Sequence, residues 1–191
     1  SIGISIYPQD DEEQEGLIKK AGTAMRQAKE HGRNNYRFYN PDMETSSYEM
    51  LMLENNLRKA LERREFILYY QPQVDINTEH IIGVEALIRW KHPDRGMVSP
   101  AEFIQLAEET GMIVPIGEWV AYTALAQNKA WQDEGFAPIK VSVNFSAIQF
   151  RQKNLVEFVT DALRKTGLNP EYMELEITES VIMTGADFVI S

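Results

Sequence analysis

The chain has 191 residues, of which 43% are hydrophobic and 25% charged, so it can bury a core and does not have the composition of a disordered protein. Its 29 acidic and 19 basic residues give a net charge of −10, which argues against binding to polymeric nucleic acid through a basic surface. The absence of cysteine excludes disulfides and thiol chemistry, and no apolar run reaches the roughly 18 residues of a membrane-spanning helix. We therefore expect no membrane contact from this segment.

The first part of the chain predicts a small α/β piece followed by a connecting helix. Isoleucines alternate with small residues over 1–6, as in a half-buried strand, and an amphipathic helix over 17–28 leads to a short strand at 37–39. Acidic and basic residues balance up to Asn40, so the acidic excess lies beyond it and predicts a boundary there. A stripe of Leu and Ala over 47–64 predicts the connecting helix.

Strands and helices alternate in the rest of the chain. The predicted strands are 66–71, 81–90, 139–145 and 173–178, and the predicted helices are 100–110, 118–134 and 155–165. Ser99 and Glu102 form a capping box around Pro100 at the start of one helix, and Gly111 ends it. This order of elements predicts an α/β fold with a parallel sheet, either doubly wound or closed into a barrel.

Polar residues occur on strands that a helix-covered sheet would keep apolar. By alternation, Glu85, Leu87 and Arg89 share one face of a strand, while Asn144 and Glu176 lie on the next two strands. A solvated sheet face would explain any one strand, and a network of structural salt bridges gives a similar pattern. Taken together, the strands predict that carboxylate and amide oxygens meet at the carboxyl edge of the sheet. Such oxygens suit Mg²⁺ or Mn²⁺, which an acidic protein would need to bind an anionic phosphodiester.

A series of motifs then follows from Phe66 to Met183. In order they are Tyr70-Gln71-Pro72, Glu85-Ala86-Leu87-Ile88-Arg89-Trp90, Pro100-Ala101-Glu102-Phe103-Ile104, Val143-Asn144-Phe145-Ser146 and Glu176-Ile177-Thr178-Glu179. At this spacing they resemble the EAL family of cyclic di-GMP phosphodiesterases. The resemblance implies a TIM-like (β/α)8 barrel, of which this chain would hold only the first strands and helices. It also implies hydrolysis of cyclic di-GMP to the linear dinucleotide with Mg²⁺ or Mn²⁺.

The same resemblance implies roles for single residues. Glu85, Asn144 and Glu176 match the family's metal ligands, and Glu85 thereby also counts as catalytic. Glu179 matches a catalytic-site glutamate that supports the following metal-bearing loop.

Three further positions match contacts to the dinucleotide in this family, namely Gln71, Leu87 and Arg89. The planar guanidinium of Arg89 suits a phosphate or a guanine edge. The alternative for Arg89 is a salt bridge to a neighbouring glutamate.

Residues 1–40 carry a second set of motifs, which are Ser1-Ile2-Gly3-Ile4, Tyr7-Pro8, Ala24-Met25, Ala28-Lys29 and Gly32-Arg33-Asn34. These resemble the C-terminal tail of the GGDEF diguanylate cyclase domain, although Gly22 and Arg26 stand where that family usually has Asp and Tyr. The resemblance implies that Lys29 and Arg33 contact nucleotide phosphate, and the alternative is that both are surface helix charges. The implied domains are a GGDEF tail at 1–40, a linker and helix at 41–64, and an EAL portion at 65–191.

From these observations we expect a piece of a bacterial signalling protein, of the kind that controls biofilm formation, cut within its predicted elements at Ser1 and Ser191. We expect a cytoplasmic location, with any membrane anchor upstream, a sensor and the GGDEF portion as partners within the parent, and a homodimer formed through the EAL domain. The family continues with an Asp-Asp metal loop and a lysine, so we expect the intact parent to hydrolyse cyclic di-GMP and this piece alone to be inactive. The alternatives are a catalytically silent cyclic di-GMP receptor or protein-interaction module, and a barrel that uses the same carboxylates for another metal-dependent reaction.

Overall fold

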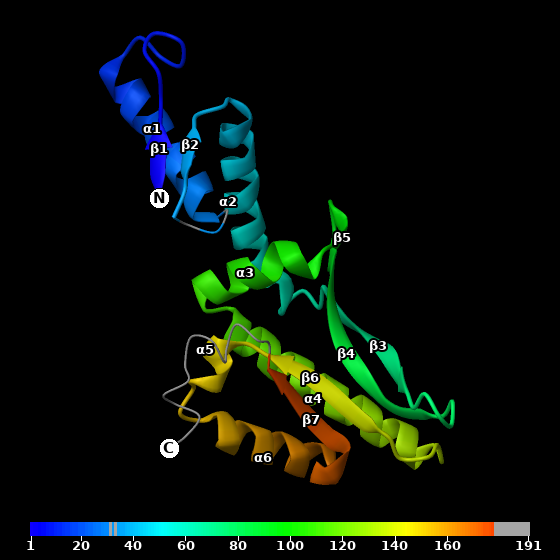
Figure 1. The fold of residues 1–191 in the computed structure, drawn as a ribbon. Coiled ribbons are helices and arrows are strands. Elements are labelled where there is room, and N and C mark those ends of the chain that lie inside the picture. The colour runs from blue at the N-terminus through cyan, green and yellow to red at the C-terminus, as the bar shows by residue number, and fades with distance from the viewer. Residues whose placement is uncertain (31, 33, 178–191) are drawn as a thin grey trace. The chain divides into compact units, whose positions relative to one another are not determined.

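The computed structural model describes residues 1–30, 32 and 34–177. The chain divides into two compact units, residues 1–55 and 56–191 (Figure 1). Helix α2 (Asp42–Ala60) crosses this division, and it begins and ends a few residues earlier than the predicted connecting helix. Among the described residues, no helix has both the length and the apolar character needed to cross a membrane.

The first unit contains the predicted strand, helix and strand. Strand β1 (Ile2–Ile4) pairs in parallel with β2 (Tyr36–Phe38), and α1 (Gln14–Glu30) connects them. The helix crosses close above β1, because a Cβ atom added to Gly3 would lie 1.9 Å from the carbonyl oxygen of Ala21. The glycine in the first strand is therefore required by the packing of the helix on it.

The second unit is built on a mixed sheet of five strands in the order β3-β4-β6-β7, with β5 paired to β4. Its strands are β3 (Phe66–Val74), β4 (Ile81–His92), β5 (Gly96–Val98), β6 (Lys140–Phe145) and β7 (Met173–Ile177). Strands β4, β6 and β7 run parallel as predicted, whereas β3 is antiparallel to β4. The connection over 75–80 is too short for a crossover helix, and the Asp75 carboxylate closes it by accepting hydrogen bonds from the backbone N–H groups of Asn77 and Thr78.

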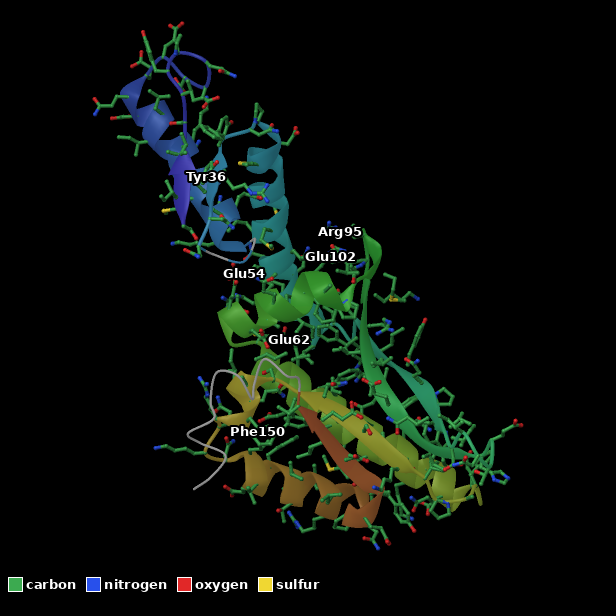
Figure 2. All side chains as sticks on the ribbon, viewed as in Figure 1. Tyr36, Glu54, Glu62, Arg95, Glu102 and Phe150 are labelled. Atoms are coloured by element: carbon green, nitrogen blue, oxygen red, sulfur yellow. The ribbon has the colours of Figure 1, made fainter. Side chains whose placement is uncertain are left out.

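Helices join the parallel strands. They are α3 (Pro100–Thr110), α4 (Ile113–Asp133), α5 (Ala147–Phe150) and α6 (Leu155–Thr166), followed by the 3-10 turn η1 (Pro170–Tyr172). The predicted capping box of Ser99 and Glu102 is confirmed, and Gly111 ends α3 with φ of 76°. Glu102 also lies 3.9 Å from Arg95 in the β4–β5 turn (Figure 2). Helix α4 begins at Ile113 rather than at 118, because its first turn is buried in the core.

The two faces of this sheet differ in polarity. One face is apolar and buried, with Val84, Ala86, Trp90, Val141, Val143 and Phe145. Phe66 on that face contacts Phe103 of α3 and Trp119 of α4, and α4 runs along β6 (Figure 1). The strand registers place Gln71, Glu85, Ser142 and Glu174 side by side on the opposite face. The sheet therefore presents a polar face that lies away from the helices packed on its apolar side.

The packing of Tyr70 on β3 can be tested through the pH dependence of the protein's stability. Its ring meets Trp131 of α4 edge-on with centroids 4.9 Å apart, and burial raises its pKa to about 12. In the unfolded chain the phenol ionises near its ordinary value of 10.0. The stabilisation that the folded protein gains from keeping this phenol neutral is therefore complete below pH 10, and it is lost as the pH rises toward 12.

The free energy of unfolding should fall less between pH 10 and about 12 in Tyr70→Phe than in the wild type, because phenylalanine has no phenol to ionise. Urea unfolding at a series of pH values in this range measures the difference. Tyr122→Phe is the matched control, since Tyr122 lies on α4 with 45% of its surface exposed. That variant should follow the wild-type pH profile. A Tyr70→Phe profile parallel to the wild type would contradict the assignment.

Candidate metal centre

Side chains from three parallel strands converge on the polar face of the sheet. Asn144 on β6 lies directly opposite Glu176 on β7, and Glu85 on β4 lies opposite Ser142. The Asn144 Nδ2 donates a hydrogen bond of 2.6 Å to Glu85 Oε1. The residues that the sequence predicted as metal ligands are therefore brought together, because parallel strands in this register present equivalent positions on one face.

This set of donors fits a hard divalent cation. It offers two carboxylates and an amide oxygen, and no ion pair between described residues involves Glu85 or Glu176. Within residues 1–30, 32 and 34–177 there is no group of three His, Asp or Glu side chains that could hold a metal. Mg²⁺ nevertheless binds proteins through one or two carboxylates while water and phosphate oxygens fill its other positions. The hydroxyl of Ser142 is buried on this same face and has no partner among the described atoms.

The positions predicted to contact a dinucleotide lie on the same face. Gln71 on β3 is exposed and pairs across the ladder with Glu85, and Tyr69 pairs likewise with Leu87. The Arg89 guanidinium lies over the Tyr69 ring, 5.6 Å from its centroid, and its Nη1 donates to the Ile88 carbonyl at 2.8 Å. The structure gives Arg89 no carboxylate partner within the described part of the chain. These contacts hold one nitrogen of the guanidinium and do not support the salt-bridge alternative.

A cavity of about 240 Å³ opens beside this group of side chains. The sheet lines it with Leu87, Arg89 and Asn144 and also with residues of its apolar side, namely Ala86, Ile88 and Phe145. Apolar residues of α3 and α4 form much of the remaining wall. Glu108 of α3 also lines it, and burial, followed by the neighbouring charge of Glu109, raises the pKa of the Glu108 carboxyl. Sequence reasoning did not identify this wall, because nothing local indicates which residues of α3 and α4 face the end of the sheet.

Gln73 on β3 is a second residue that the sequence analysis missed. Its Nε2 lies 3.5 Å from Glu176 Oε1, although the two residues are 103 positions apart in the chain. The alternation of Tyr69, Gln71 and Gln73 along β3 was the available signal, since it places all three on the polar face.

Three predicted positions belong to the first unit or lie outside the described residues. Glu179 and Arg33 are among the residues that the structure does not describe. Lys29 is exposed in the last turn of α1, in the first unit.

Comparison with known proteins identifies relatives of this chain. The model of the EAL domain family matches residues 54–189. The bifunctional diguanylate cyclase/cyclic di-GMP phosphodiesterase MucR of Pseudomonas aeruginosa is 46% identical over 187 residues, which cover 98% of this chain and 27% of that protein. The cyclic di-GMP phosphodiesterase PdeR of Escherichia coli is 37% identical over 193 residues, covering 100% of this chain and 29% of that protein.

The solved structures agree with this match. The structure described as the PaMucR phosphodiesterase in complex with c-di-GMP aligns with a TM-score of 0.68 and 48% identity, covering 71% of this chain and 55% of that one. The EAL enzyme Bd1971 in its cGMP-bound form aligns with a TM-score of 0.68 and 34% identity, covering 75% of this chain and 41% of that one. The chain thus spans between a quarter and a third of the length of the curated relatives named above.

Proposed function

The chain belongs to the EAL domain family, and from this premise we propose that it serves cyclic di-GMP signalling by hydrolysing cyclic di-GMP to the linear dinucleotide within a longer protein. The proposal is supported most directly by the hydrogen-bonded pair of Glu85 and Asn144 beside Glu176 at the polar face of the sheet. Relatives that carry phosphodiesterase names align over nearly the whole chain, which adds support.

We propose that Glu85, Asn144 and Glu176 hold Mg²⁺ or Mn²⁺. When bound, such an ion supplies Lewis-acid stabilisation of a phosphoryl oxygen and activation of water. The chain's own contribution is to hold the oxygen donors in place. The Asn144 amide N–H fixes one oxygen of the Glu85 carboxylate, which leaves the other Glu85 oxygen and the Asn144 carbonyl oxygen available as ligands.

Substrate binding is assigned to the neighbouring side chains. The Arg89 guanidinium is held by Ile88 and Tyr69 and keeps donors for a phosphate or a guanine edge. Gln71 and Leu87 lie on the same face of the sheet and would contact the dinucleotide beside it. We also retain Glu179 as a support for a metal-bearing loop, which is a proposal that rests on the family motif alone.

The remaining parts of the proposal concern the rest of the protein. We propose that residues 1–40 are the C-terminal tail of a GGDEF domain, because the alignment with the bifunctional cyclase/phosphodiesterase covers 98% of this chain. Lys29 and Arg33 would then contact nucleotide phosphate. We further propose a barrel completed by additional strands, a homodimer through the EAL domain, an upstream sensor and a cytoplasmic location. The 191-residue polypeptide alone is proposed to be inactive.

The experiment is to incubate an intact protein that carries this chain with cyclic di-GMP and to measure release of the linear dinucleotide by chromatography. We expect release with Mn²⁺ or Mg²⁺, loss of release with a chelator, and recovery when the metal is restored, because the oxygen donors here need a divalent cation for this reaction. Binding of cyclic di-GMP without release would favour the silent receptor. Absence of both would contradict the proposed function.

A further inference from the structure

Gln73 lies within reach of Glu176, one of the proposed metal ligands. It is half-buried on β3, and its side-chain amide points at Glu176 on β7 across the polar face of the sheet. The separation of 3.5 Å is longer than the 2.7–3.2 Å typical of N–H···O hydrogen bonds. At this distance the amide nitrogen lies within reach of the carboxylate oxygen but makes only a weak contact with it.

The residue opposite Gln73 on β4 is Gly83, and it leaves the space that the amide occupies. A Cβ atom at Gly83 would lie 2.8 Å from Gln73 Oε1 and 3.3 Å from the Lys140 carbonyl oxygen. Gly83 is buried near the start of β4 on its polar face, where any other residue would project a side chain into this space. The absence of a side chain there therefore allows the Gln73 amide to lie over β4 and reach toward β7.

The Glu176 carboxylate also determines which end of the Gln73 amide faces it. An amide nitrogen can donate to a carboxylate, whereas the amide oxygen would be repelled by it. With Nε2 directed at Glu176, the amide oxygen is directed at Gly83. Gln73 thus offers its donor to the one carboxylate of the set that receives no hydrogen bond from Asn144 in the structure.

We propose that Gln73 is a positioning residue that orients the Glu176 carboxylate for the metal, and that Gly83 preserves the space it needs. The inference rests on the proposed function, because it takes Glu176 as a ligand. Donation to one oxygen of a ligating carboxylate restricts its rotation and directs the other oxygen to the ion. Outer-shell partners of this kind typically change metal affinity or activity by about 10–100-fold when they are removed.

The test compares Gln73→Met, which removes the donor but keeps an unbranched side chain, with Gly83→Ala, which obstructs the amide. In an intact protein that carries this chain, Mn²⁺ affinity is measured by electron paramagnetic resonance of the free ion, and folding is checked by thermal unfolding. We expect both variants to bind Mn²⁺ about 10–100-fold more weakly. Hydrolysis should fall at limiting Mn²⁺ and recover at saturating Mn²⁺, which a purely structural defect would not produce.

Lys140→Met is the matched control. Lys140 lies in register with Gly83 on the same face, but it is 57% exposed and pairs with Glu174 at 3.6 Å instead of contacting a proposed ligand. This variant should keep the wild-type Mn²⁺ affinity. If Gly83→Ala fails to fold, Gln73→Met decides the question alone.

The outcomes separate this inference from the function on which it rests. If Glu176→Gln weakens Mn²⁺ binding while Gln73→Met and Gly83→Ala leave it unchanged, the role of Gln73 is overturned and the metal centre stands. If Glu176→Gln leaves Mn²⁺ affinity unchanged, the proposed metal centre and the role of Gln73 are overturned together.

Discussion

Replacing Glu85 by glutamine is expected to lower both Mn²⁺ affinity and cyclic di-GMP hydrolysis by more than about 100-fold, since loss of a ligand should exceed the 10–100-fold effect of an outer-shell partner. The substitution keeps the size of the side chain and its place on β4 but removes the negative charge. It also places a neutral amide against the Asn144 amide, which donates to Glu85 Oε1 at 2.6 Å. Mn²⁺ titration and release of linear dinucleotide, measured on an intact protein that carries this chain, provide the two readouts.

Glu174→Gln is the control for charge. Glu174 lies on the same polar face, on β7 two positions before Glu176, and its half-exposed side chain pairs with Lys140. Exposed ion pairs contribute only about 0–1 kcal/mol, so this variant should fold and bind Mn²⁺ nearly as the wild type does. Equal losses in the two variants would indicate a general effect of charge on this face. Unchanged affinity in Glu85→Gln would remove the basis of the proposed metal centre.

Trp90→Ala is expected to lower the free energy of unfolding by about 3–5 kcal/mol, the usual cost of deleting a large buried aromatic side chain. Trp90 is 0% exposed, and its ring centroid lies 5.9 Å from that of Phe66 and 5.6 Å from that of Phe103. Its Nε1 also donates to Glu65 Oε2 at 3.0 Å. Urea unfolding followed by far-UV circular dichroism measures the change. Because Trp90 and Glu85 share β4, we also expect the variant to bind Mn²⁺ less completely at elevated temperature.

Two further variants show how large the loss for Trp90→Ala is by comparison. Trp90→Phe keeps most of the packing but leaves the Glu65 carboxylate without the indole donor, and we expect it to cost about 1–3 kcal/mol. Tyr122→Ala removes an aromatic side chain that is 45% exposed on α4, and we expect a change within about 0.5 kcal/mol. A loss for Trp90→Ala no larger than that for Tyr122→Ala would contradict the assignment of Trp90 to the core.

Much of the second unit could be predicted because its signals are local. Helix α3 was predicted with its bounds, since Ser99, Glu102 and Gly111 satisfy the backbone groups at the two ends of the helix. The parallel strands were predicted from their apolar runs, and alternation placed Glu85, Asn144 and Glu176 on particular faces. Short elements such as β5 and α5 were missed because few residues carry too little periodicity to be recognised.

The sequence by itself determined the longer elements, the caps of α3 and the kinds of donor that each strand carries, because these depend on residues close together in the chain. Only the tertiary structure decided that β3 runs antiparallel to β4, that Asn144 bonds Glu85, and that Gln73 reaches Glu176. These contacts depend on strand register and on which side chains leave space for others, as Gly83 does. Register is a property of strands paired across the whole sheet, and residues 103 positions apart share no local signal that would reveal it.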